Sequence, residues 1–264
     1  IFSQGTPGTA LNINNNTVTS ATVSTTSYNA ASGFIINASG GNSGTAVSIS
    51  NNSLGGLSYT GGSINTFYGI FNQSAWSSVT IDNNTFNNLS LNCGGGSANI
   101  YLCYNNSATN TISFSGNSIT TGFAKTITGG NMYCYLDVTS ATGGTATINN
   151  NNFSNIALTG NTTFYGIEHE TGTVQVMSIT NNTISTVSTG ASSMYGIYTS
   201  GGAAGSVISG NTLSGFASTT SAITGILIGI AGTPVSLSCY NNNINGFSGT
   251  GSGSMYGIYS AAGS

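Results

Sequence analysis

One short pattern of apolar and polar residues runs from end to end: an apolar residue, two others, an asparagine, one further residue and a second apolar residue, as in Ile179 to Ile184. The anchoring asparagines are Asn16, Asn52, Asn84, Asn117, Asn151, Asn182, Asn211 and Asn242. Their separations of 36, 32, 33, 34, 31, 29 and 31 residues are typical of a solenoid. The longest interval predicts an insertion through Ser39, Gly40, Gly41 and Asn42.

Core-type residues flank each asparagine on both sides. Three positions before it lie Ile13, Ile49, Ile81, Phe114, Ile148, Ile179, Ile208 and Cys239. Two positions after it lie Val18, Leu54, Phe86, Ile119, Phe153, Ile184, Leu213 and Ile244. Each asparagine therefore joins two strands that bury an apolar residue apiece.

A second phrase, Tyr-Gly-Ile, appears about halfway through the period. Clear copies are Phe67-Tyr68-Gly69-Ile70, Phe164-Tyr165-Gly166-Ile167, Met194-Tyr195-Gly196-Ile197 and Met255-Tyr256-Gly257-Ile258, with weaker copies around Tyr101, Tyr133 and Ile226. Each period thus predicts three strands, one entering the asparagine, one leaving it and one carrying this phrase, joined by Gly, Ser, Thr and Asn.

The fold class we predict is all-β, a right-handed parallel β-helix, or β-solenoid. It has about eight coils of roughly 32 residues with three strands each, and a length of about 40 Å at the usual strand spacing. Residues 1–264 form a single solenoid domain, with residues 1–12 leading into the first coil. A leucine-rich repeat shares part of the pattern, but it prefers Leu and a shorter period of about 20–29 residues.

Two stacks of side chains should hold neighbouring coils together. At a coil spacing of about 4.8 Å, each asparagine amide can donate to the amide on one side and accept from the amide on the other, which predicts a ladder. An asparagine also suits the left-handed backbone of a tight corner. The Tyr-Gly-Ile phrase predicts a second, aromatic stack of Tyr68, Tyr101, Tyr133, Tyr165, Tyr195 and Tyr256.

Charged residues make up only 2% of the chain, which carries a net charge of −3. With one Lys or Arg in all, Lys125, there is no basic patch for nucleic acid, and no apolar run is long enough for membrane insertion. Four cysteines without a Cys-x-x-Cys spacing, and one histidine, give no metal site, and we expect no cofactor.

Apart from Asp82, the few charged residues and the one histidine gather between Asn117 and Asn182. Aligning Tyr133 with Tyr165 places Asp137 and His169 at the same position of neighbouring coils. Glu168 and Glu170 then point to the opposite side of the strand from His169. These four residues are weak catalytic candidates, for acid and base work on a glycosidic bond. We favour instead a few charges on an exposed strand end.

The cysteines allow a disulfide between Cys103 and Cys134, which lie at similar places in successive coils. A bond between Cys93 and Cys103 is the alternative, and Cys239 reads as a buried free thiol. A disulfide would agree with a secreted, extracellular or cell-surface location.

The Ile-x-x-Asn-x-Ile coil resembles the pectate-lyase-like β-helix superfamily over nearly the whole chain. Enzymes of that kind use acidic calcium ligands with a basic residue, or clustered aspartates, so the resemblance implies the fold rather than catalysis here. The low-charge coils, rich in Asn, Thr and Gly, also resemble the repeat regions of large secreted bacterial surface proteins and adhesins.

The function we expect is structural: a filament subunit, stalk or adhesin segment without catalysis. Such a rod would associate with itself head to tail, or stack on neighbouring repeats of the same protein. A start at Ile1 without Met suggests a mature or excised segment, and a stop after a Tyr-Gly-Ile phrase suggests that the array continues.

Two alternatives stay open. One is a β-helix that binds or cleaves glycans, as a polysaccharide lyase or glycoside hydrolase. The other is an ice-binding solenoid, suggested by small polar residues on either side of the inward apolar position. These pairs are Thr17/Thr19, Ser53/Gly55, Thr85/Asn87, Ser118/Thr120, Asn152/Ser154, Thr183/Ser185, Thr212/Ser214 and Asn243/Asn245.

Overall fold

In a computed structural model of the chain, the described residues form thirty strands, all paired in parallel, which make up three sheets. The structure describes residues 1–5, 7–19, 22–23, 32–38, 45–60, 66–73, 76–93, 95–138, 143–170, 175–219, 221–229 and 236–261. The insertion predicted through Ser39, Gly40, Gly41 and Asn42 lies outside these residues.

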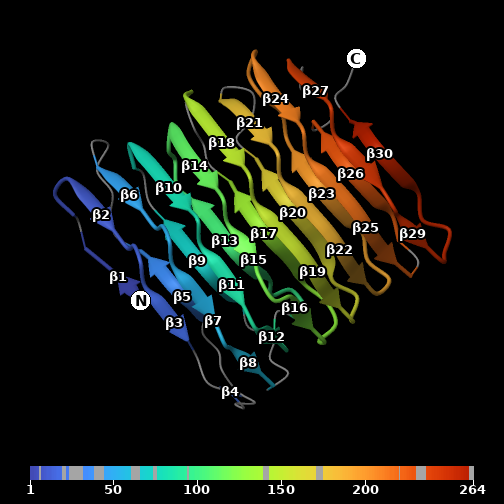
Figure 1. Ribbon diagram of the computed structural model, residues 1–264, viewed down its shortest axis with the longest axis horizontal. Coiled ribbons are helices and arrows are strands. Elements are labelled where there is room, and N and C mark those ends of the chain that lie inside the picture. The colour runs from blue at the N-terminus through green and yellow to red at the C-terminus, as the bar shows by residue number, and fades with distance from the viewer. Residues whose placement is uncertain are drawn as a thin grey trace.

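Sheet A carries the Tyr-Gly-Ile phrases. Its nine strands are, in order, β1 (Phe2–Ser3), β5 (Ser32–Asn37), β9 (Phe67–Gln73), β13 (Ile100–Asn106), β17 (Asn131–Asp137), β20 (Thr163–His169), β23 (Met194–Thr199), β26 (Ile223–Ile228) and β30 (Met255–Ser260). Figure 1 shows them following one another in sequence order from the N-terminus to the C-terminus.

Sheet B holds the strands that enter the asparagine corners. Its eight strands are β2 (Ala10–Asn12), β6 (Ala46–Ser48), β10 (Ser78–Asp82), β14 (Thr111–Ser115), β18 (Thr145–Asn149), β21 (Val176–Thr180), β24 (Ser206–Ser209) and β27 (Leu237–Tyr240).

Sheet C holds the strands that leave the corners, and in several coils it is broken into two lanes. The first lane is β3 (Thr17–Thr19), β7 (Ser53–Gly55), β11 (Thr85–Asn87), β15 (Ser118–Ile119) and β28 (Asn243–Asn245). The second lane is β4 (Thr22–Val23), β8 (Ser58–Tyr59), β12 (Leu89–Leu91), β16 (Phe123–Lys125) and β29 (Ser248–Gly249). The unbroken strands β19 (Asn152–Leu158), β22 (Thr183–Thr189) and β25 (Thr212–Ser218) span both lanes.

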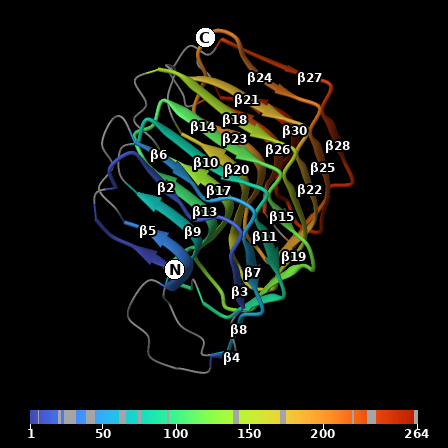
Figure 2. The same ribbon diagram turned by 60° about the vertical axis from the view of Figure 1, so that its left-hand side comes forward.

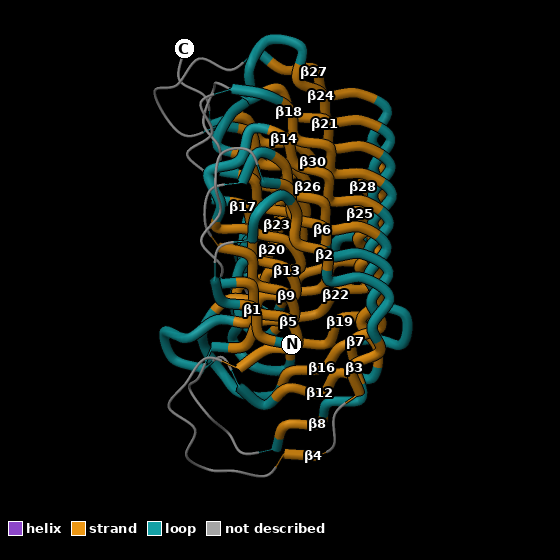
Figure 3. Tube along the Cα trace, turned by 90° about the vertical axis from the view of Figure 1, so that its left-hand side faces the viewer, coloured by secondary structure: helices purple, strands orange, loops and turns teal. Residues whose placement is uncertain are grey.

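The architecture is therefore the predicted β-solenoid, with three parallel sheets and coils piled one on another (Figures 2 and 3). The predicted core residues stack in register. Before the corner, Phe114 pairs with Ile148 and Ile148 with Ile179, and after it Ile184 pairs with Leu213. All five are fully buried, so each coil covers the apolar surface of the next.

The corners differ from the prediction in one respect. The residue with left-handed backbone is the one before each ladder asparagine, not the ladder asparagine itself. These residues are Asn15, Asn51, Asn83, Gly116, Asn150, Asn181, Gly210 and Asn241. Only Asn and Gly occupy the position, because they tolerate this conformation best. The tight turn frees the following asparagine to point along the solenoid.

Sheet C contains a second left-handed column. It lies four residues after most ladder asparagines, at Gly56, Asn88, Asn155, Thr186, Gly215 and Gly246. Thr186, with φ of 55°, is the one β-branched residue among them. A β-branched side chain is strained in this region, so the column tolerates local strain within a well-paired strand.

The glycine of the Tyr-Gly-Ile phrase is required by close packing. A Cβ on Gly166 would lie 2.5 Å from the backbone oxygen of Gly196 in the next coil and 2.5 Å from Cδ1 of Ile184 across the core. The glycine thus lets sheet A approach the apolar residue that follows the corner.

Candidate functional site

The predicted asparagine ladder is present and uninterrupted at the corner between sheets B and C. At Asn117, the backbone N–H and the side-chain Nδ2 both donate to Oδ1 of Asn151, at 2.9 and 3.1 Å. Nδ2 also donates to the backbone oxygen of Ile81, at 2.8 Å. The same three bonds recur at Asn52, Asn84, Asn151, Asn182 and Asn211. Each buried amide thereby satisfies its own groups and a backbone N–H.

A second ladder, which the sequence analysis missed, lies in sheet A. Nδ2 of Asn37 donates to Oδ1 of Asn72 at 2.7 Å, and Nδ2 of Asn72 donates to Oδ1 of Asn105 at 2.8 Å. Asn105 in turn donates to Oδ1 of Asp137 at 3.1 Å. The signal was present, since each of these polar residues from Asn72 onward lies four positions after the tyrosine of its phrase.

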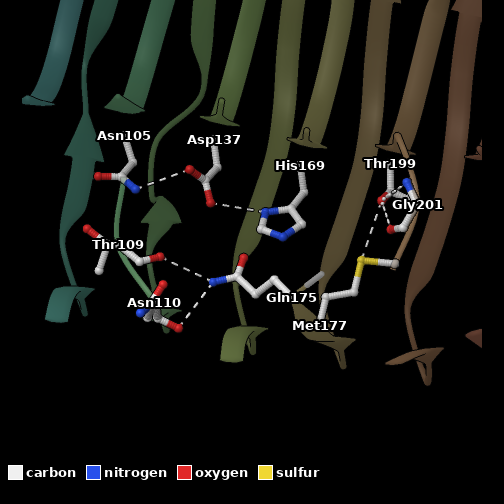
Figure 4. A network of polar contacts seen from close by, with 9 residues as sticks. All are labelled: Asn105, Thr109, Asn110, Asp137, His169, Gln175, Met177, Thr199 and Gly201. Atoms are coloured by element: carbon white, nitrogen blue, oxygen red, sulfur yellow. Dashed lines mark hydrogen bonds and ion pairs between the residues drawn. The ribbon is translucent and has the colours of Figure 1, made fainter. Parts of the chain in front are cut away.

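Asp137 and His169 continue this second ladder (Figure 4). They pair in register, as predicted, and Oδ2 of Asp137 lies 3.1 Å from Nδ1 of His169. Their side chains are fully buried, so the interpretation of an exposed strand end is wrong for them. A carboxylate that orients an imidazole is a catalytic arrangement only where a substrate can reach it. Here Asp137 and His169 occupy the column positions that Asn72 and Asn105 fill in earlier coils.

Glu168 and Glu170 lie on the outer side of sheet A, opposite His169 as predicted. Glu168 is only 7% exposed, and one of its oxygens, Oε2, is buried with no hydrogen-bond partner. Burial raises the pKa of Glu168 to about 8, and a hydrogen bond with Glu170 and the charge of Glu170 add to the effect. Glycosidases hold their two carboxyl groups about 5–9.5 Å apart. A directly hydrogen-bonded pair is closer than that.

The predicted tyrosine stack is present over five coils. Ring centroids lie 5.2 Å apart from Tyr68 to Tyr101, 5.0 Å to Tyr133, 4.8 Å to Tyr165 and 5.0 Å to Tyr195, with planes within 20° of parallel. Tyr256 does not join the stack. The register partner between Tyr195 and Tyr256 is Thr224, which has no ring, and Tyr256 contacts Tyr259 instead.

The stacking of the tyrosine rings limits their use as a sugar-binding surface. Sugar-binding aromatic platforms offer a ring face, whereas rings stacked along the solenoid cover each other's faces and leave their edges outward. The column therefore contributes chiefly to packing between coils. Its members Tyr101 and Tyr133 each accept a hydrogen bond from an asparagine two residues earlier, at 2.8 and 2.9 Å.

Lys125 is buried inside the solenoid. Its Nζ donates to the backbone oxygens of Ile127 and Gly129, at 2.9 and 2.7 Å, and to Oγ1 of Thr162 at 2.5 Å. Burial lowers the pKa of Lys125 to about 8, an effect partly offset by the nearby Cys93. The lysine thus serves the interior and offers no charge to a partner.

The cysteines are free, and the predicted disulfide between Cys103 and Cys134 is not formed. Cys103 pairs in register with Tyr135, one position beyond Cys134, so the two thiols are offset along neighbouring strands. Cys93 is also free, which rules out the alternative bond in this structure, and Cys239 is a free thiol but only half-buried.

The polar pairs of sheet C form a regular array. Thr85, Ser118, Asn152, Thr183 and Thr212 are successive register partners along the first lane. Hydrogen bonds link neighbours within it, for example Ser154 to Ser185 at 2.8 Å. Gly55 alone among the paired positions is buried. The array is uncharged, with hydroxyl and amide groups at the coil spacing.

Within the described ranges, no group of three or more His, Cys, Asp or Glu residues could hold a metal ion. That same part of the chain has no helix long and apolar enough to cross a membrane. The chain matches no family model, no curated protein and no solved structure.

Proposed function

We propose that this chain is a structural β-solenoid, a stiff rod within a secreted or cell-surface protein such as a stalk, fibre or adhesin. The observation that carries the proposal is the corner ladder, which runs from Asn16 to Asn242 with every internal amide hydrogen-bonded on both sides. Together with the three parallel sheets, it makes each coil a template for the next.

The placement of the ionisable side chains supports a structural role. Asp137 and His169 complete a buried ladder, and Lys125 is enclosed by backbone and hydroxyl oxygens. These groups, which an enzyme would present to a substrate, are here enclosed inside the coils.

Assembly through the coil edges is part of the proposal. The outermost strand β30 leaves Met255, Tyr256, Ile258 and Tyr259 between 42% and 51% exposed. An unpaired parallel edge with apolar side chains is a template for another strand. A neighbouring repeat or a second copy, stacked head to tail, would cover it.

Negative-stain electron microscopy at low and high protein concentration tests the proposal. We expect rods that join end to end into filaments of uniform width as concentration rises. Rods that stay single and dispersed at every concentration would contradict assembly by coil stacking.

A second candidate, ice binding, draws on the polar array of sheet C. Its hydroxyl and amide groups repeat in register over successive coils and carry no charge. The test is thermal hysteresis of the protein solution, compared with a Thr183→Tyr variant that places a bulky ring in the array. Activity abolished by the substitution would support this function, and no hysteresis in the unsubstituted protein would refute it.

Glycan binding or cleavage, as by a lyase or hydrolase, is less well supported, because the tyrosine faces are covered and the carboxyl pair is in direct contact. A glycan array with the unsubstituted protein tests this alternative. Binding lost on substitution of Glu168 or Glu170 would favour it over the structural role.

A further inference from the structure

The outer face of sheet A has a pair of carboxyl groups with no cationic partner from the protein. Glu168 and Glu170 lie there two residues apart on one side of the strand. The chain has a single Lys or Arg, and that residue, Lys125, is buried and bonded to three oxygens. His169, the one histidine, is buried against Asp137. A cationic side chain from a second copy is therefore not available either.

An aromatic ring beside the tyrosine stack lies crosswise to it at this spot. Tyr198 pairs in register with Glu168, on the next strand. Its ring crosses the planes of Tyr165 and Tyr195 at 88° and 71°, with centroids 6.1 and 6.0 Å away. Tyr104 holds the same register position two coils before Glu168. Its ring plane lies within 19° of parallel to that of Tyr101. The stack itself continues from Tyr165 to Tyr195. Tyr198 lies crosswise to both of these rings, so neither ring covers its face.

One carboxyl oxygen of Glu168 lacks a hydrogen-bond donor. Its side chain is more than nine-tenths buried, at 7% exposed, and Oε2 has no hydrogen-bond partner. A buried carboxyl oxygen left unpaired costs free energy that a donor from outside would recover. The side chain faces the same outer surface as Tyr165, three residues before it, because the strand turns its inward side to Phe164, Ile167 and His169.

The chemistry of the spot selects the ligand. Metal ions such as calcium need about six to eight oxygen ligands, and the described residues provide no group of three or more metal-binding side chains. An ammonium group needs less: a carboxylate to accept its hydrogen bond or balance its charge, and an aromatic ring to contact it.

We propose that Glu168, Glu170 and Tyr198 form a binding site for an organic ammonium group. This goes beyond the structural role, because it gives the rod one place of chemical recognition among uncharged coils. The carboxyl pair supplies the charge, Oε2 of Glu168 accepts a hydrogen bond where the cation has one to give, and the ring of Tyr198 supplies the aromatic contact.

Binding should depend on pH in one direction. Glu168 has a pKa of about 8, so it is mostly neutral at pH 6 and mostly ionised at pH 9. The phenols that face it are Tyr101 on β13, Tyr133 on β17, Tyr165 on β20 and Tyr198 on β23, and burial raises the pKa of each, so they stay neutral across this range. Glu170 is the other carboxyl group of the spot. A cation should therefore bind more tightly as pH rises.

The test uses choline, whose charge does not titrate, with binding measured by calorimetry at constant ionic strength. We expect the apparent dissociation constant to fall at least about tenfold from pH 6 to pH 9, as ionisation of Glu168 is linked to binding. Glu168→Gln, which mimics the neutral acid, should weaken binding at pH 9 and remove the pH dependence. Tyr198→Leu should weaken it at both values.

The matched control is Asp82→Asn on sheet B, a half-buried carboxyl bonded to Ser113 and Ser115, which should leave choline binding unchanged. Circular dichroism verifies that each variant is folded. Absence of binding at pH 9, equal binding by Glu168→Gln, or the same heat from sodium chloride would overturn the proposal. A short oligolysine peptide in place of choline distinguishes the source: tighter binding of the peptide indicates a partner's lysine, and tighter binding of choline a free amine.

Discussion

The corner ladder and the sheet A ladder both join neighbouring coils by side-chain hydrogen bonds, but the corner ladder uses more bonds per residue and accepts only asparagine. In the corner, each asparagine uses its backbone N–H as well as its Nδ2 to reach the next amide, and Nδ2 also bonds a backbone oxygen. In sheet A, one side-chain bond links each pair of rungs from Asn37 to Asp137. The corner has asparagine in every coil, whereas the sheet A column changes to aspartate, histidine and then Thr199.

The difference shows what makes a ladder position specific. A corner removes a backbone N–H from the sheet, so the side chain must replace a backbone partner, and only a residue that accepts and donates along the axis can do so. Within a strand the backbone is already paired, so the side chain has only to satisfy its neighbours. Other polar residues can then stand in the column.

Breaking two rungs of the corner should have the largest effect. Asn151→Ala with Asn182→Ala leaves the backbone N–H of Asn117 and the oxygens of Phe114 and Ile148 unpaired. We expect the free energy of unfolding to fall by about 1–3 kcal/mol for each substitution. Urea unfolding measures it. The control, Asn152→Ala with Ser154→Ala, removes outward side chains of the next strand. An unchanged melting temperature in the corner variant would refute the ladder.

Breaking two rungs of sheet A should cost less. Asn72→Ala with Asn105→Ala removes side-chain bonds but leaves the backbone pairing of β9 and β13 intact. We expect a loss of about 1–3 kcal/mol in total, measured by the same urea unfolding. A loss equal to that of the corner variant would remove the distinction between the two ladders.

Beside the ionisable rungs, stability should depend on pH. The folded chain holds the proton of Glu168 more tightly than the unfolded chain, with a pKa of about 8 against an ordinary 4.5. Between these values the folded state binds more protons, so the free energy of unfolding falls as pH rises. In Glu168→Gln, we expect the fall in the free energy of unfolding between pH 5 and pH 7.5 to be smaller by at least about 1 kcal/mol.

Chemical denaturation at several pH values measures this slope. The comparison stops at pH 7.5 because the lowered pKa of Lys125, about 8 against 10.5, makes stability rise with pH above that point. A slope in Glu168→Gln as steep as in the unsubstituted protein would contradict the assignment.

The smallest effect we expect is a gain. Thr186 has left-handed backbone, at the position that other coils fill with Asn155 and Gly215. Thr186→Asn should relieve strain and stabilise the rod by about 0.5–1 kcal/mol, seen as a higher urea midpoint. Ser188→Asn, an exposed position of the same strand without left-handed backbone, is the control. A lower midpoint for Thr186→Asn would contradict the strain.

The sequence predicted the coil, the corner ladder and most of the tyrosine stack because each repeats at the period of the solenoid. It did not separate the two asparagines of a corner, since Asn181 and Asn182 look alike and only the backbone distinguishes the left-handed one. The Cys103 to Cys134 pairing was wrong by one residue of register, because the phrase after Tyr133 lacks Gly-Ile and gives no fixed alignment.

The sequence predicted only part of the sheet A ladder. Asp137 and His169 were placed together correctly, but their burial was not foreseen, because charged residues are seldom fully buried unless paired. The alignment that joined them also reaches back to Asn105 and Asn72, which identifies the column as a ladder. Burial of Lys125 follows from three-dimensional contacts that no local pattern encodes.

Amide hydrogen exchange at the corners tests the ladder most directly. In the folded protein the backbone N–H of Asn117 donates to Oδ1 of Asn151, so it should exchange as slowly as amides within the sheets. In Asn151→Ala that one amide should become fast, while the N–H of Asn84, bonded to Asn117, stays slow. Fast exchange of the Asn117 amide in the unsubstituted protein would contradict the ladder as the element that joins the coils.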